Sequence, residues 1–204
     1  MDATVEDGPG GLLVAELDSG DSMLAASDAL VDHTGGVRVE RARKGVLRSV
    51  ANAARQRQRT PVRVTATEDT TARFSPNHSG SVVAAPLGED GIAATRDAFV
   101  AAEASVRVGA DRVGDAPARG SGLFLTTVAG DGRAFVAGHG RVDAVSVPAG
   151  DDRVVSAAHV VAFGADADVA VERVGAIEDA PAACRVRGPT TVWVSTRPSP
   201  RFTQ

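Results

Sequence analysis

The sequence predicts an all-β fold, arranged as a single domain over residues 1–204. Three observations support this prediction. Short runs in which apolar and polar residues alternate recur along the chain, bounded by Gly, Pro, Asp and Asn. Valine is the commonest large apolar residue, and its branched Cβ favours strands over helices. A strand–turn–strand pattern also recurs, which indicates related modules.

The clearest strands are those with strict alternation. Residues 61–67 and 169–174 each have one apolar and one polar face. Residues 184–187 and 190–196 form a further pair of runs, separated by the turn Gly188-Pro189. An apolar content of 43% is sufficient for a core, and a chain of this length needs no disulfide or metal for stability.

The internal repeat defines the domain organisation. One copy covers residues 17–26 and 29–31, and a second copy aligns with it without a gap 130 residues later. A looser copy runs through 81–101, and each copy consists of a strand, a turn, a strand and a third apolar strand. We expect three pseudo-repeats sharing one core, at about 12–75, 76–118 and 119–197, with residues 1–11 and 198–204 as flexible tails.

One basic segment departs from the β pattern. Apolar residues at 46, 47, 50 and 54 have helical spacing and predict one short helix at about 45–56. Residues 38–63 contain nine Lys and Arg but a single acid, although the whole chain has a net charge of −4. The candidate interaction surface comprises Arg41, Arg43, Lys44, Arg48, Arg55, Arg57 and Arg59.

Three interpretations of this basic segment stay open. Its arginines can pair with the acidic remainder of the protein, dock on an anionic membrane or acidic protein, or contact nucleic acid. The nucleic-acid interpretation is disfavoured, because proteins that bind single strands stack bases on aromatic rings and no aromatic residue lies between Met1 and Arg73.

Five motifs, at 20–26, 36–48, 122–124, 156–163 and 188–197, resemble those of one known family. It is the family of the mitochondrial biogenesis protein altered inheritance of mitochondria 24, and the resemblance spans Leu12 to Arg197. The resemblance implies a fold like the trp RNA-binding attenuation protein, a double-stranded β-helix or β-sandwich that forms symmetric homo-oligomers. It implies no known reaction.

Metal-binding cupins share that type of fold, and their second motif places a His ligand and then an Asn after Pro-x-Gly. Pro148-Ala149-Gly150 is present, but Arg153 stands where the His ligand belongs and Ala157 where the Asn belongs. Only His139 and His159 are placed to share a module, so we expect no metal site and no cofactor. His139 lies between two glycines and is expected to be solvated, whereas His159 is expected to be half-buried and hydrogen-bonded.

No nucleophile has the surroundings of a catalytic residue. Ser121 lacks the fuller nucleophile-elbow motif. For the single cysteine, Cys184, two interpretations stay open: Arg185 lowers the pKa of its thiol, or the thiol is structural and inert. One cysteine favours a reducing compartment, and the acidic amino terminus does not resemble a secretory signal, so we expect a cytoplasmic protein.

We therefore expect a non-catalytic structural or interaction protein that forms a homo-oligomer, with a trimer or a larger ring as open possibilities. Its basic segment would dock on an acidic protein or an anionic membrane surface. The alternative is a small-ligand or nucleic-acid binding module with a fold like the attenuation protein. A third hypothesis is a hydrolase or metal-dependent oxygenase whose site assembles only in three dimensions.

Overall fold

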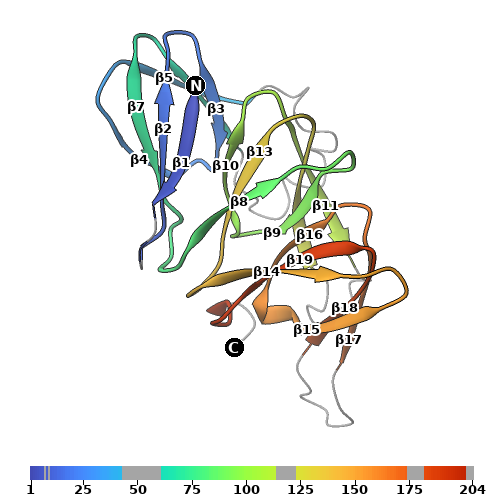
Figure 1. Ribbon diagram of the computed structural model, residues 1–204. Coiled ribbons are helices and arrows are strands. Elements are labelled where there is room, and N and C mark those ends of the chain that lie inside the picture. Colours follow the sequence, from blue (N-terminus) through green and yellow to red (C-terminus); the bar gives the residue numbers. More distant parts are fainter. Residues whose placement is uncertain (7, 9, 43–60, 114–122, 174–181, 201–204) are drawn as a thin grey trace.

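The computed structural model describes all residues except 7, 9, 43–60, 114–122, 174–181 and 201–204 (Figure 1). The described part consists of strands and one short 3₁₀ turn, η1 (Ala157–His159), which confirms the prediction of an all-β fold. The helix predicted at 45–56 lies outside the described residues. The strands are β1 (Asp2–Glu6), β2 (Leu12–Leu17), β3 (Ser22–Ala25), β4 (Leu30–His33), β5 (Val37–Arg41), β6 (Val62–Ala66), β7 (Thr70–Phe74), β8 (Val82–Pro86), β9 (Ile92–Thr95), β10 (Phe99–Glu103), β11 (Arg107–Val113), β12 (Leu123–Ala129), β13 (Arg133–Ala137), β14 (Val142–Val147), β15 (Asp152–Ser156), β16 (Val160–Gly164), β17 (Asp168–Arg173), β18 (Ala182–Arg187) and β19 (Thr190–Ser195).

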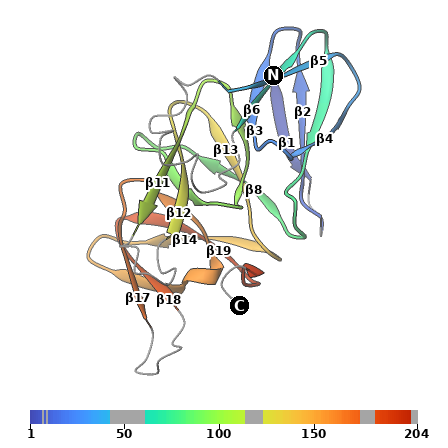
Figure 2. The ribbon, with the colours of Figure 1, turned by 180° about the vertical axis from the view of Figure 1, so that it is seen from behind.

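The strand pairing repeats along the chain. A unit of six strands occurs as β2–β7, β8–β13 and β14–β19, which we call the first, second and third modules. In each module the sixth strand pairs with the first and third, and the fifth pairs with the second and fourth. Figures 1 and 2 show the modules following one another from blue through green to red.

Two of the expected boundaries need correction. Strands β12 and β13 pair with strands of the second module, so the second boundary lies at 138–141 instead of at 118/119. The expected tail at 1–11 is also wrong for its first part, because β1 pairs along its whole length with β2. A fixed repeat length misses the second boundary, since the connections within the modules differ in length.

Neighbouring modules are joined by strand pairing. The third strand of one module adds to the second strand of the module before it, as β10 to β3 and β16 to β9. These two contacts create six-stranded sheets that cross the module boundaries. The junction strands are buried on both faces, which explains why they read as apolar runs rich in alanine instead of alternating.

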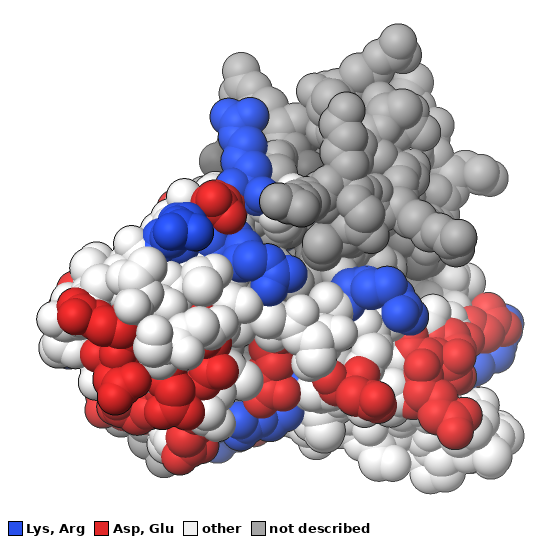
Figure 3. Space-filling view, turned by 90° about the horizontal axis from the view of Figure 1, so that it is seen from above, with Lys and Arg blue, Asp and Glu red and all other residues white. Residues whose placement is uncertain are grey.

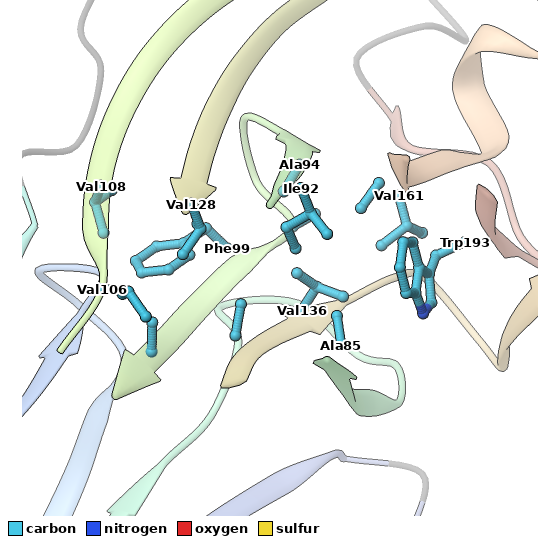
Figure 4. Close-up of a cluster of buried hydrophobic side chains, with 14 of the residues drawn as sticks. Ala85, Ile92, Ala94, Phe99, Val106, Val108, Val128, Val136, Val161 and Trp193 are labelled. Carbon is cyan, nitrogen blue, oxygen red and sulfur yellow. The ribbon is translucent and has the colours of Figure 1, made fainter. Parts of the chain in front are cut away.

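The cores are also shared between modules. Val100 and Phe135 of the second module pack in one cluster with Leu13 and Met23 of the first. Trp193 of the third module joins the cluster of the second in the same way (Figure 4). Because the clusters combine residues of neighbouring modules, no module has a complete core of its own. Burying an aromatic side chain across each boundary contributes about 3 kcal/mol to the stability of the fold.

The two linkers between modules cross closely. Gly80 and Gly140 form an isolated parallel bridge, and the amide of Ser81 donates to the carbonyl of Gly140 at 2.7 Å. A Cβ at Gly80 would lie 1.8 Å from the carbonyl oxygen of Gly138. Only glycine allows the two backbones to approach this closely.

Candidate interaction surface

The structure describes one of the seven residues of the basic surface predicted from the sequence. Arg41 is exposed at the end of the edge strand β5. The other predicted members, Arg43, Lys44, Arg48, Arg55, Arg57 and Arg59, lie outside the described residues.

Two further arginines lie on the same pair of strands. Arg38 is exposed on β5, and Arg63 on β6 is half-buried and donates to Ser22 Oγ at 2.8 Å. Because side chains alternate along a strand, Arg38 and Arg41 project from opposite faces of β5. In Figure 3, several basic side chains lie in the upper part of the view, and most acidic side chains gather in its lower part.

Several arginines elsewhere in the described chain are held in ion pairs. Arg73 binds Asp32, Arg141 binds Asp143 at 3.0 Å, and Arg185 binds both Asp152 and Glu172. Within the part of the chain that the structure describes, neither Arg38 nor Arg41 makes an ion pair. This edge can therefore offer its positive charges to an outside partner.

His139 and His78 form a stacked pair at the crossing of the two linkers. Their ring centroids lie 4.0 Å apart with an angle of 26° between the planes. His78 Nδ1 is buried and has no hydrogen-bond partner among the described residues. Burial lowers the pKa of His139, the charge of His78 acts in the same direction, and Asp97 opposes both.

This pairing corrects two sequence-based expectations. His139 is half-buried instead of solvated, and its partner is His78, not His159. The glycines beside His139 indicated a turn correctly, but no local pattern showed that a second linker crosses it. Within the described ranges, no three His, Cys, Asp or Glu side chains are placed to hold a metal ion.

His159 has the predicted surroundings. It lies at the end of η1, it is half-buried, and its Nδ1 lies 2.7 Å from the carbonyl oxygen of Ser195. The hydroxyl of Ser195 donates to the carbonyl of Arg197 at 2.8 Å. These contacts join η1 to the end of β19 and support a structural role for the ring.

The structure favours the second interpretation of Cys184. Its thiol is fully buried in β18, and burial raises the pKa to about 12. Arg185, the next residue, projects from the opposite face and binds carboxylates there. The thiol therefore stays protonated and behaves as a small core residue. Ser121 lies outside the described residues.

A shallow hollow of about 380 Å³ opens beside β15. Its wall is partly apolar, with Val145, Val154, Val155 and Val194. Asp143, Arg153, Ser156 and His159 complete the lining. Such a mixed surface can accept a protein segment that brings both apolar and charged side chains.

Together, the strand pairing and the exposed arginines of β5 define an all-β repeat protein with a basic edge strand. A family model described as mitochondrial biogenesis AIM24 matches residues 3–197, and the chain belongs to this family. Its fold is similar to the crystal structure of protein SPYM3_0169 from Streptococcus pyogenes, with a TM-score of 0.79 and 20% sequence identity, covering 99% of this chain and 96% of that chain. No curated protein matches the chain. Among the described residues, no helix is long and apolar enough to span a membrane.

Proposed function

We propose that this chain is a non-catalytic structural or interaction protein of the cytoplasm. It assembles with copies of itself and docks on an anionic surface through the basic segment that begins at β5. The observation behind this proposal is that Arg38 and Arg41 are exposed and without an ion pair in the described part of the chain, next to the most basic stretch of the sequence.

Charge distribution supports docking on a membrane surface rich in anionic lipids. Nine basic residues lie between 38 and 63 in a chain whose net charge is −4, so the positive charge is strongly localised. Each Lys or Arg close to an anionic leaflet contributes about 1 kcal/mol at physiological salt. Several such residues together are sufficient for reversible binding.

The state of the other reactive groups agrees with a non-catalytic role. The Cys184 thiol is held protonated by burial, and the His159 ring contacts a backbone carbonyl. Nucleic-acid binding receives less support. The Phe and Trp side chains whose exposure the structure describes are all buried, so they offer no surface on which bases can stack. These are Phe74, Phe99, Phe135, Phe163 and Trp193.

Co-sedimentation with vesicles tests the docking. We expect the protein to bind vesicles that contain phosphatidylserine at low salt, to ignore neutral vesicles, and to dissociate at high salt. The double variant Arg38→Glu/Arg41→Glu should bind several-fold more weakly. Arg197→Glu, which reverses an exposed charge near the other end of the chain, is the matched control. Equal binding of both variants, or none by the unaltered protein, would contradict membrane docking.

A further inference from the structure

Two strands of this protein lack the partner from a neighbouring module that their counterparts have. The third strand of a module pairs with the second strand of the module before it, which occupies β10 with β3 and β16 with β9. This rule leaves β4, the third strand of the first module, and β15, the second strand of the third module, at sheet edges. Of the other edges, β5, β11 and β17 are fourth strands, which are edges in every module. The remaining edges are β8 and β14, whose counterpart β2 pairs with β1, and β1 itself.

The register of the repeat identifies equivalent residues on β4. A bulge interrupts the pairing at the same place in each third strand, between Leu30 and Asp32, Phe99 and Ala101, and Val160 and Ala162. Val31 is therefore equivalent to Val100 and Val161. The latter two are 1% and 2% exposed at the module junctions, whereas Val31 is 55% exposed.

The same comparison applies to β15. At the two junctions, Phe163 pairs with Ala93 and Ala102 pairs with Leu24. Val154 occupies the position in the third module that Ala93 occupies in the second and Leu24 in the first. Ala93 and Leu24 are 3% and 0% exposed, but Val154 is 45% exposed. Only four large apolar side chains in the described part of the chain are strongly exposed, and two of them are Val31 and Val154.

We propose that β4 of one copy of this chain adds to β15 of a second copy and reproduces the junction found twice within the chain. The strands would pair antiparallel, with His33 of one copy opposite Val154 of the other and Asp32 opposite Val155. This inference rests on the proposed self-association and assigns its interface.

The hollow beside β15 is suited to receive the first module. Its residues Asp143, Arg153 and Val155 are equivalent to Leu13, Met23 and Ala25. In the first module, those three positions form the core into which Val100 and Phe135 of the second module pack. The corresponding space on the third module is open and is part of the hollow.

Charges on the two surfaces are complementary. Arg73 of the first module is equivalent to Phe135 of the second and Trp193 of the third. It pairs with Asp32 across the two strands. Docking in the repeat geometry brings Arg73 towards Asp143 and Asp32 towards Arg153 of the second copy. The ion pair between Arg73 and Asp32 of a free chain is exposed, so its rearrangement costs little.

An interface between two different strands is heterologous. It generates a closed ring when the rotation from copy to copy closes, and an open filament when it does not. The smallest closed ring is a dimer in which β4 of each copy pairs with β15 of the other. The competing outcome is that the polar residues on β4 and β15 only cap the ends of the array, as terminal repeats do in other repeat proteins, so that the chain stays monomeric.

A mixing experiment with edge variants tests this interface by sedimentation velocity. Val31→Glu blocks β4 and Val154→Glu blocks β15, and both residues are exposed, so the fold should be retained, as circular dichroism can verify. Each variant alone should raise the concentration needed for assembly at least about tenfold. An equimolar mixture should form dimers only, because the two chains together retain one intact junction. Val39→Glu, at an equally exposed position on β5, should assemble like the unaltered protein.

Cross-linking tests the register. A chain with His33→Cys and Val154→Cys should give a ladder of disulfide-linked species on oxidation, since residues directly opposite in a sheet have Cα atoms about 4.5–5.5 Å apart. The control chain carries His33→Cys and Asp152→Cys, because Asp152 lies two positions away from Val154 on β15. A monomeric unaltered protein would overturn both this inference and the proposed self-association. Oligomers that ignore Val31→Glu and Val154→Glu, or a ladder from the control alone, would overturn this interface and leave self-association standing.

Discussion

The imidazole rings of His78 and His139 lie stacked, with 4.0 Å between their centroids, where the two linkers between modules cross. Each ring belongs to a different linker, so the stack joins the connection before β8 to the connection before β14. His78 Nδ1 is buried and has no hydrogen-bond partner among the described residues, so the stack holds a polar atom away from solvent.

Stability should therefore decrease in mild acid. The pKa of His139 lies below its ordinary value of 6.5 in the folded chain, so the unfolded chain binds the proton more readily. The contribution of this group is complete above pH 6.5 and is lost as the pH falls through the folded pKa. Denaturant unfolding at several pH values should show a smaller acid-induced decrease for His139→Gln than for the unaltered protein.

The three modules should unfold together. Phe135 is fully buried in a cluster that combines residues of the first and second modules, and Phe135→Ala should reduce the free energy of unfolding by about 3–5 kcal/mol. Trp193, the single tryptophan, reports on the boundary between the second and third modules. Its fluorescence and far-ultraviolet circular dichroism should give coincident transitions in both proteins. Separate transitions for the two signals would mean that the modules unfold independently.

Glycine at position 80 should be essential for the linker crossing. A Cβ there would meet the carbonyl oxygen of Gly138 at 1.8 Å, and both partners are backbone, so Gly80→Ala should destabilise the protein by several kcal/mol. Gly88→Ala is the matched control, because a Cβ at that position has nothing within 4 Å. We expect a change of less than about 1 kcal/mol there, from the loss of backbone freedom in the unfolded chain. Thermal unfolding of the two variants provides the comparison.

The Cys184 thiol should be inert in the native protein. It is fully buried and its pKa is raised to about 12, so almost no thiolate exists at neutral pH and no reagent can reach the sulfur. Labelling with a thiol reagent at pH 8 should be slow in buffer and fast in denaturant. Rapid stoichiometric labelling of the folded protein would show that β18 opens readily, in conflict with its central place in the sheet β15-β18-β17.

The sequence was informative wherever strands alternate. The runs at 61–67 and 184–187 correspond to β6 and β18, and each has one face in a core cluster. The junction strands were harder to read, because β9 and β10 are buried on both faces and show no alternation. For the candidate surface, composition located the basic segment, but only the structure showed that Arg41 lies on an edge strand and makes no ion pair in its described surroundings.

By itself, the sequence determined the all-β fold, the family and the presence of a repeated strand pattern, because alternation and turn residues are local properties that a linear pattern records. Only the tertiary structure decided how the modules join, that His78 meets His139, and that Val31 and Val154 remain exposed where their equivalents are buried. These relationships depend on strand register between distant segments. Short apolar strands of similar composition are compatible with several registers, and the choice among them is made by packing across the whole molecule.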